Sequence, residues 1–443
     1  MEDKIDGLPQ EFTTRMREML GAEYDAFAAT YAMPVARGLR VQRAKVADWD
    51  AIAPYALAPI PWSPASYYYD EGMEPGKHVL HDVGAYYIQE PSAMAVAAAL
   101  EARPGERVLD LCAAPGGKTC AIADDMQGQG LLVANEIVPS RAATLARNVE
   151  RMGIGHCLVL NESPATLAAR WRGTFDRIVV DAPCSGEGMF RKTPAARAEW
   201  SVDNVEMCAR RQYEILSSAQ RLLRPGGVLV YSTCTFSPQE NEYLIARFLA
   251  AYPEFEPSAL PAAVPGARDA DAYMQRLYPH RLRGEGHFIA RLRKRGDGAS
   301  QIDAAACAPS KRDLQTWNAF ADDTLARALC PNERIGDTLC LTPLHPDLRG
   351  IRALRTGLHL GRVVKDRIEP DHALAVRDGH GWFVRTLDLA DDVSAALRYL
   401  RGETLDCPHK GWGVATVFGL ALGWYKGDGR IAKNHYPKGL RRR

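Results

Sequence analysis

Two cysteines in this chain of 443 residues each follow an apolar segment that ends in polar residues. Cys184 stands in Asp181-Ala182-Pro183-Cys184, and Cys234 stands in Ser232-Thr233-Cys234. A single cysteine at a strand end is usually a small buried hydrophobic residue. Two at neighbouring strand ends, one of them in Asp-x-Pro-Cys, indicate covalent catalysis instead, because a thiolate is a strong nucleophile.

Methylation of cytosine at carbon 5 is a reaction that needs such a cysteine, since that carbon is a poor nucleophile. Addition of a thiolate to carbon 6 turns the ring into an enamine, whose carbon 5 can attack a sulfonium methyl group. A base then removes the carbon 5 proton and the thiol is expelled. Asp181 would stabilise the charge that builds up near ring nitrogen 3. The chemistry leaves open which cysteine attacks, because DNA cytosine methyltransferases use the one in Pro-Cys.

A turn of small residues after the apolar segment 107–111 is the candidate cofactor site. Glycines let the backbone approach a ligand closely, and its amides can bind a carboxylate. The turn has neither the G-x-G-x-x-G spacing nor the upstream glycine of a P-loop. Glu136, about twenty residues on, suits a ribose diol, so the pair favours S-adenosylmethionine over NAD. The turn consists of Cys112, Ala113, Ala114, Pro115, Gly116, Gly117 and Lys118.

Two more polar residues follow predicted strands. Asp110 ends the first strand and could face the ligand, and Asn161, after the third, could bond the adenine amino group through its side-chain oxygen. An asparagine there is also a common turn residue. The histidines indicate no metal site, since only His78 and His81 lie close together and no cysteine joins them at ligand spacing.

The elements that must position these residues alternate between strands and helices. Predicted strands cover 107–111, 131–134, 158–160, 177–181 and 228–232. Predicted helices cover about 119–126, 139–152 and 205–223, the last stopped by Arg224-Pro225-Gly226-Gly227. Strands this apolar are typical of a parallel sheet covered on both faces, which binds ligands at its carboxyl edge. We therefore expect an α/β, Rossmann-like core.

The chain divides into four predicted zones. Residues 1–75 form a small α+β domain, residues 76–295 the catalytic domain, residues 296–311 a linker without apolar periodicity, and residues 312–443 a tail domain with short strands. Aromatic residues near the first boundary could stack RNA bases, although such clusters usually belong to a core. They are Tyr67, Tyr68, Tyr69, Tyr86 and Tyr87.

Composition indicates an ordinary globular protein with a net charge of only +1. Ten scattered cysteines without a C-x-x-C pair favour a reducing cytosol. No long apolar stretch predicts a membrane helix, and the acidic start does not suit a signal peptide. Cations gather in segment 281–295 and in the last fourteen residues, and Arg191-Lys192 follows the Pro-Cys motif. Such cations fit phosphate contacts or, about equally, a solvated surface.

Taken together, these motifs resemble the Sun (NSUN) family of RNA cytosine-5 methyltransferases, and within it the RsmF-type ribosomal RNA enzymes. The core resemblance is carried by residues 84–90, 109–119, 181–188, 231–235 and 284–288. The RsmF-type resemblance is carried by residues 8–9, 38–41, 423–424 and 434–440.

The resemblance implies that Cys234 is the nucleophile and that Cys184 assists elimination of the product. It implies that residues 112–118, Glu136 and Asp181 contact S-adenosylmethionine; relatives usually have Asp where this chain has Asn161. It further implies a C-terminal PUA-like, β-rich RNA-binding domain.

The expected partner is RNA, namely 16S rRNA or the small ribosomal subunit, and not DNA or a membrane. We expect a cytoplasmic monomer. Two alternatives stay open: a transfer-RNA substrate, and a catalytically inactive RNA-binding assembly factor, which need not bind S-adenosylmethionine.

Overall fold

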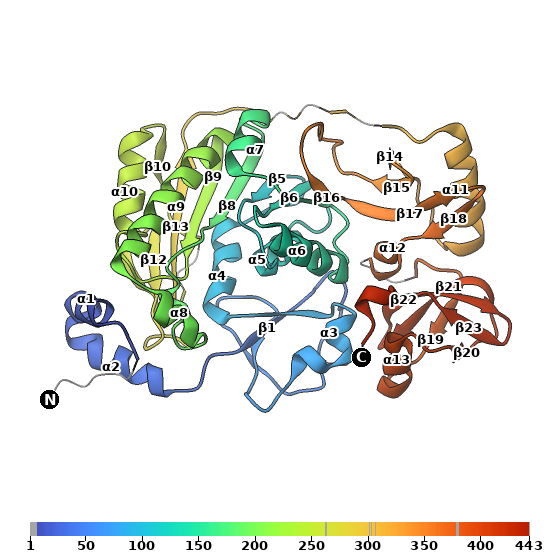
Figure 1. The fold of residues 1–443 in the computed structure, drawn as a ribbon, viewed down its shortest axis with the longest axis horizontal. Coiled ribbons are helices and arrows are strands. Elements are labelled where there is room, and N and C mark those ends of the chain that lie inside the picture. Colours follow the sequence, from blue (N-terminus) through green and yellow to red (C-terminus); the bar gives the residue numbers. More distant parts are fainter. Residues whose placement is uncertain are drawn as a thin grey trace.

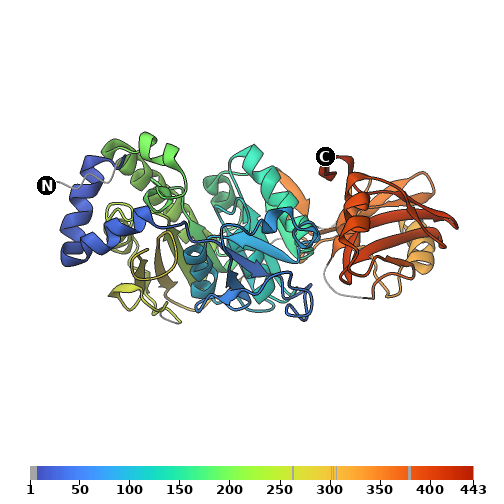
Figure 2. The ribbon, with the colours of Figure 1, turned by 90° about the horizontal axis from the view of Figure 1, so that it is seen from below.

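The computed structural model describes residues 7–261, 264–300, 302, 304–305, 307–377 and 381–442. Three features of the sequence lie wholly or partly outside these ranges: the acidic start at residues 1–4, part of the segment 296–311, and the last cation, Arg443. The chain runs from small helices at one end of the molecule, through a large central sheet, to two smaller sheets at the other end (Figures 1 and 2).

The central sheet has ten strands in the order β11-β12-β13-β9-β8-β5-β6-β7-β16, and β10 pairs with β13. The middle strands β9, β8, β5, β6 and β7 are parallel, whereas β13 and β16 run antiparallel to their neighbours. The bounds are β5 Arg107–Asp110, β6 Leu131–Asn135, β7 Cys157–Leu160, β8 Phe175–Asp181, β9 Leu223–Thr233, β10 Phe255–Pro257, β11 Arg268–Asp271, β12 Met274–Leu277, β13 His287–Lys294 and β16 Ala353–Thr356.

Helices cover both faces of this sheet, as the apolar strands predict (Figure 1). One face packs against α4 (Pro91–Leu100), α5 (Gly117–Asp125) and α6 (Pro139–Arg151). The other packs against α7 (Pro164–Arg170), α9 (Val202–Leu222) and α10 (Glu242–Ala251). The parallel strands all end on the same edge, so the residues that follow them are brought together there.

The helix predicted to stop at segment 224–227 ends there, since α9 ends at Leu222, but the strand predicted from residue 228 begins earlier, at Leu223. Phe175 of β8 pairs with Leu223, and Arg177 pairs with Val228, so the register shifts and residues 224–227 are accommodated as an irregularity inside the strand.

The N-terminal part combines helices with a small sheet. The amphipathic pattern predicted near residue 12 is confirmed: α1 buries Phe12, Met16 and Leu20. The sheet has the order β2-β3-β1-β4, and Tyr86 and Tyr87 belong to its last strand. Bounds are α1 Gln10–Leu20, α2 Tyr24–Ala29, β1 Gly38–Val41, β2 Ala58–Pro59, β3 Ser66–Tyr68, α3 Val79–Asp82 and β4 Tyr86–Gln89. The later helix α8 (Pro194–Glu199) packs against the apolar cluster of α1.

The aromatic cluster of this part is core. Tyr68, Tyr69, Tyr86 and Tyr87 are all buried, and the half-buried Tyr67 stacks on Trp49 with ring centroids 6.1 Å apart. These rings therefore stabilise the fold and do not offer faces to RNA bases.

The C-terminal part contains two more sheets, in the orders β14-β15-β17-β18 and β19-β21-β22-β23-β20. Bounds are α11 Lys311–Thr324, β14 Glu333–Ile335, β15 Thr338–Leu341, β17 Leu358–Val364, β18 Arg367–Pro370, α12 His372–Val376, β19 Thr386–Asp388, α13 Val393–Arg401, β20 Leu405–Asp406, β21 Lys410–Val417, β22 Leu420–Asp428 and β23 Ile431–Asn434.

This part is tied to the rest of the molecule by packing. β16 leaves it to pair with β7 at the edge of the central sheet. Tyr399 and Leu400 of α13 share one apolar cluster with Leu39 and Val79 of the N-terminal part. Removal of residues 312–443 would therefore expose core on both neighbours. The domain boundaries at residues 75, 295 and 311 stay predictions. Among the described residues, no helix is long and apolar enough to cross a bilayer.

Candidate active site

The predicted cofactor turn lies between β5 and α5 at the carboxyl edge of the sheet. Gly116 caps α5 with a φ of 113°, a left-handed conformation that side chains rarely adopt. A Cβ on Gly117 would lie 3.0 Å from the Gln89 side chain and 3.2 Å from Tyr87. Both glycines are therefore required by the fold, and they leave the backbone of the turn open to close approach by a ligand.

Asp110 lies beneath this turn and is fully buried. Its Oδ2 accepts a hydrogen bond of 2.6 Å from Thr119, whereas its Oδ1 has no partner among the described residues. Burial raises the pKa of Asp110 to about 7, although the Thr119 bond and Lys118 oppose the shift. The free oxygen is one that a ligand could satisfy.

Glu136 and Asn161 follow β6 and β7. The Asn161 amide donates to the carbonyl oxygens of Glu136 and Ile137, at 2.8 and 2.9 Å, and so holds the loop that carries Glu136. Glu136 is buried, accepts from the Val138 amide at 2.9 Å, and lies 3.5 Å from Arg141. Both side-chain N–H groups of Asn161 thus donate to the protein backbone, and its side-chain oxygen remains available to accept from an adenine amino group.

These residues fit S-adenosylmethionine. Asp110 keeps an unpaired buried oxygen beneath the turn, and Glu136 supplies a carboxylate for a ribose diol. Sequence reasoning missed Asn135, whose amide donates to the carbonyl oxygens of Leu111, at 3.3 Å, and Glu162, at 3.0 Å, and so ties together the ends of three strands.

The two cysteines meet at the same edge. The sulfur atoms of Cys184, after β8, and Cys234, after β9, lie 3.2 Å apart. Their loops interlock because the Gly188 amide donates to the Cys234 carbonyl oxygen at 2.8 Å. The hydrogen bond to Cys234, together with burial, raises the pKa of the Cys184 thiol well above its usual value. Cys184 therefore keeps its proton at neutral pH.

A buried carboxylate joins the two cysteine loops, and sequence reasoning missed it. Glu240 accepts hydrogen bonds from the Ser185 amide at 3.0 Å, from the Ser185 hydroxyl, and from Gln212 at 2.8 Å. Ser185 Oγ in turn lies 2.9 Å from the hydroxyl of Thr235. Ser185 follows Cys184 and Thr235 follows Cys234, so this network holds each thiol in place through its neighbour.

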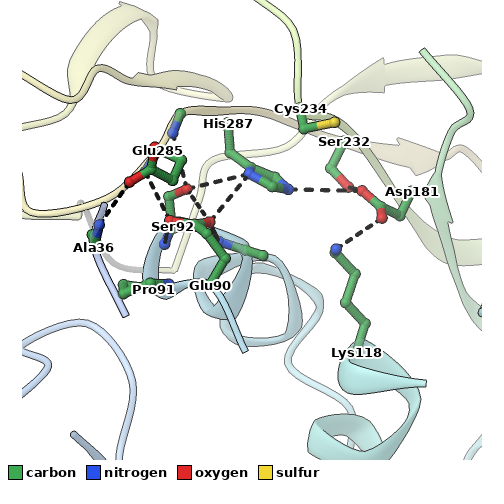
Figure 3. Close-up of polar contacts among 12 residues, drawn as sticks. Ala36, Glu90, Pro91, Ser92, Lys118, Asp181, Ser232, Cys234, Glu285 and His287 are labelled. Atoms are coloured by element: carbon green, nitrogen blue, oxygen red, sulfur yellow. Dashed lines mark hydrogen bonds and ion pairs between the residues drawn. The ribbon is translucent and has the colours of Figure 1, made fainter. Parts of the chain in front are cut away.

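Asp181 lies at the centre of a second polar group (Figure 3). Lys118 donates to its Oδ2 at 2.8 Å, Ser232 donates to its Oδ1 at 2.7 Å, and His287 Nε2 lies 3.9 Å from Oδ1. Burial opposes ionisation, but the charge of Lys118 and the hydrogen bonds from Lys118 and Ser232 outweigh it and lower the pKa of Asp181. Asp181 is therefore a carboxylate in the free protein.

Several cations that could have contacted phosphate form ion pairs or hydrogen bonds within the protein instead. The Arg191 side chain is only 7% exposed; it donates to the carbonyl oxygen of Pro34 at 2.8 Å and lies 3.5 Å from Glu285. Lys192 beside it is exposed. The segment 281–295 is neutralised by ion pairs of Arg281 with Glu23, Arg283 with Asp70, Arg291 with Glu101, and Arg293 and Arg295 with Glu256. Arg442 of the basic tail pairs with Asp82.

No group of three or more histidine, cysteine or acidic side chains within the described ranges is arranged to hold a metal ion.

Four family profiles match this chain. The profile described as 16S rRNA methyltransferase RsmB/F matches residues 97–293, and the N-terminal domain of 16S rRNA methyltransferase RsmF matches residues 8–91. The RsmF rRNA methyltransferase first C-terminal domain matches residues 320–377, and the methyltransferase RsmF PUA domain matches residues 386–442.

Individual relatives agree with these profiles. Ribosomal RNA small subunit methyltransferase F of Enterobacter sp. (strain 638) is 40% identical, and the alignment covers 98% of this chain and 95% of the relative. The same-named protein of Citrobacter koseri is 39% identical, over 65% of this chain and 63% of the relative's length.

Solved structures give the fold. A methyltransferase homologue from Pyrococcus horikoshii has a TM-score of 0.56 at 29% identity, covering 65% of this chain and 96% of its own. NSun6 from the same organism, solved with SFG, has a TM-score of 0.59 at 21% identity, covering 66% of this chain and 100% of its own. The second likeness is one of fold alone.

The fold and the family profiles thus place the chain among S-adenosylmethionine-dependent methyltransferases with a Rossmann-like core and a C-terminal PUA domain. Within that class, the chain belongs to the RsmF family of 16S rRNA methyltransferases.

Proposed function

We propose that the protein methylates carbon 5 of a cytosine in 16S rRNA through a covalent bond between Cys234 and carbon 6 of the base. The observation that carries the proposal is the pair of thiols 3.2 Å apart at the edge that also holds Asp181 and Lys118. Membership of a 16S rRNA methyltransferase family supports ribosomal RNA over the transfer-RNA alternative.

In this proposal, the turn of residues 112–118 together with Asp110, Glu136 and Asn161 holds S-adenosylmethionine. When bound, the cofactor supplies the methyl group. The chain's own part is to position the base and to make carbon 5 nucleophilic. The Cys234 thiolate adds its electron pair to carbon 6, a sulfur–carbon bond forms, and the electrons of the ring double bond are shifted toward carbon 5 and nitrogen 3.

Asp181 and Lys118 stabilise the charge at nitrogen 3. Because Asp181 is ionised in the free protein, it acts as the partner of a protonated nitrogen 3 and not as the resting source of that proton. The Lys118 ammonium, 2.8 Å from Asp181, can supply the proton. The ion pair therefore combines a donor and an acceptor within reach of one ring edge.

Cys184 serves the elimination step. The Cys184 sulfur lies 3.2 Å from that of Cys234, so its S–H can donate to the Cys234 sulfur as that sulfur leaves. A base takes the carbon 5 proton, the electrons of that C–H bond restore the ring double bond, Cys234 departs as a thiolate with the electrons of the sulfur–carbon bond, and the proton on nitrogen 3 returns to Lys118. Without Cys184, the protein should remain attached to the base.

The test compares Cys234→Ala and Cys184→Ala after incubation with RNA and S-adenosylmethionine, followed by a denaturing gel. We expect no methylation and no adduct from Cys234→Ala, and a slowly migrating RNA–protein adduct from Cys184→Ala. An adduct with Cys234→Ala but none with Cys184→Ala would reverse the roles. A wild-type protein that binds RNA but not S-adenosylmethionine would support the inactive assembly factor instead.

We also propose that a C-terminal cleft docks the RNA. It lies between β18 and the sheet of β21, β22 and β23, and is lined by Arg362, Arg367, Ile368, Trp412, Lys426 and His435 among others. The exposed Lys426 lies 5.3 Å from the centre of the Trp412 ring, and His435 packs against the same ring at 4.5 Å. Cations beside an aromatic face suit phosphates and stacked bases. The cleft is also lined by Glu150, Glu369 and Asp371, and its walls come from both the first C-terminal domain and the PUA match.

A further inference from the structure

His287 is a buried histidine that the proposed chemistry does not use, although it lies within the active site. It opens β13, next to Phe288, which pairs with Thr233 beside Cys234. One ring nitrogen, Nδ1, lies 3.3 Å from the hydroxyl oxygen of Ser92. The other, Nε2, is buried and has no hydrogen-bond partner among the described residues. Figure 3 shows its longer contact with Asp181 Oδ1, at 3.9 Å.

The surrounding hydrogen bonds assign the tautomer of His287. The Ser92 hydroxyl donates its proton to Glu90, and its oxygen accepts from the Gly286 amide at 3.3 Å. The oxygen then has a lone pair left for a proton on Nδ1, but no proton to give. Glu90 is held in place by the amides of Ser92, Ala93 and Glu285, so Ser92 cannot easily turn around. Nδ1 therefore carries the ring proton.

The ring is also neutral. Burial, helped by the charge of Lys118, lowers the pKa of His287, although Asp181 and Glu90 oppose the shift. A neutral ring with its proton on Nδ1 leaves Nε2 as a bare acceptor.

Two acceptors thus face one another across 3.9 Å, His287 Nε2 and Asp181 Oδ1. His287 Nε2 is a buried acceptor without a donor, which is costly, and Asp181 Oδ1 can accept a second hydrogen bond besides the one from Ser232, so the pair is suited to a ligand that brings protons. The exocyclic amino group of cytosine carries two N–H bonds on one nitrogen. Uracil has a carbonyl oxygen in the same place, which would face acceptors only.

We propose that His287 reads the 4-amino group of the target base: Nε2 accepts one amino N–H, and Asp181 Oδ1 accepts the other. The inference rests on the proposed function, since it takes a cytosine to lie beside Cys234. It makes His287 a residue that selects cytosine over uracil and holds the ring edge, while Lys118 and Asp181 Oδ2 remain available to nitrogen 3.

The proposal is tested with two variants of His287, which differ in whether they place a polar atom at the position of Nε2. His287→Asn keeps a polar group near the Nδ1 position and removes the acceptor at Nε2, whereas His287→Gln reaches the Nε2 position with an amide. Each is compared with wild type on an RNA fragment that carries either cytidine or pyrimidin-2-one at the methylated position. Pyrimidin-2-one lacks the amino group. It also differs from cytidine in intrinsic reactivity, but this difference is the same for every protein and cancels when the cytidine-to-pyrimidin-2-one ratio of a variant is divided by that of wild type.

We expect wild type to favour cytidine over pyrimidin-2-one, in single-turnover methylation and in the amount of Cys234 adduct. His287→Asn should reduce that ratio about tenfold, the effect of one hydrogen bond, and His287→Gln should restore part of it. An unchanged ratio in both variants overturns the inference. Equal slowing on both bases also overturns it, because that result indicates a role in activating the thiol instead.

Controls separate this inference from the others. His280→Asn changes another buried histidine, which pairs with Glu23 at 2.9 Å beside the N-terminal helices, and should leave the ratio unchanged. If the His287 variants do not fold, Ser92→Ala tests the same point. Without the Ser92 oxygen as acceptor, the ring proton is no longer held on Nδ1 and can move to Nε2, which should also lower the ratio. Absence of any 5-methylcytidine and any adduct from wild type would contradict the proposed function, not the reading of the amino group.

Discussion

The carboxyl edge of the central sheet and the C-terminal cleft are the two places proposed to contact RNA, and they differ in how their polar side chains are held. At the edge, Lys118 is only 11% exposed and bonded to Asp181, and the cysteine loops are joined through buried Glu240. In the cleft, Lys426 is exposed and rests on the Trp412 ring. Chemistry needs groups held in one geometry, whereas docking needs charges that remain available to phosphates.

The same contrast explains the cationic segments. Segment 281–295 is rich in Arg and Lys, yet Arg281 and Arg291 pair with Glu23 and Glu101, so the segment stabilises the fold. Density of charge along the sequence therefore does not locate the RNA surface, because a partner from elsewhere in the chain can neutralise each cation. If the contrast holds, changes at the edge alter the rate of methyl transfer, and changes in the cleft alter RNA affinity.

The largest effect is expected at Asp181. Asp181→Asn should lower the single-turnover rate about 10²-fold or more while RNA affinity stays the same, because it removes the charge that stabilises the addition step. Asp176→Asn is a matched control on the same strand, at the end far from the site, where Asp176 pairs with Arg224 at 2.6 Å. An unchanged rate for Asp181→Asn would refute the role.

A smaller effect is expected in the cleft. Trp412→Ala should weaken RNA binding about tenfold through loss of stacking, and Lys426→Ala should reduce the salt dependence of binding by about one phosphate contact. The single-turnover rate at saturating RNA should not change. Arg312→Ala, which removes an exposed cation paired with Asp366, is the control. Equal affinities across several salt concentrations would show that RNA docks elsewhere.

The smallest effect concerns stability and Glu240. Burial raises the pKa of Glu240 from 4.5 to about 7 in the folded protein. A raised carboxyl pKa stabilises the fold fully below pH 4.5, and this contribution is lost as pH rises through 7. Between pH 5 and 8 the melting temperature of wild type should fall by about 3 °C more than that of Glu240→Gln. Asp110 also titrates near 7, but it is present in both proteins, so the difference isolates Glu240. Parallel melting curves would contradict the assignment.

The sequence alone predicted the elements that local patterns define. Apolar strands and helices were located within a few residues; α5, for example, begins at Gly117 and β6 spans Leu131–Asn135. The turn 112–118 and the two cysteines were found because strand ends on one sheet edge must meet. Such features depend on short stretches of chain, whose periodicity and glycines restrict the backbone directly.

The tertiary structure decided which side chains become partners. The sequence assigned no role to Glu240, Ser92 or His287. It left Arg191 open between a phosphate contact and a solvated surface, and the structure pairs Arg191 with Glu285 instead. Likewise β16, some 200 residues after β7, completes the central sheet. The physical reason is that the protonation state and the hydrogen bonds of a polar group depend on the groups that surround it in space. Glu90 and His287, for example, lie close together in the fold but are 197 positions apart in the chain, so no local sequence pattern could pair them.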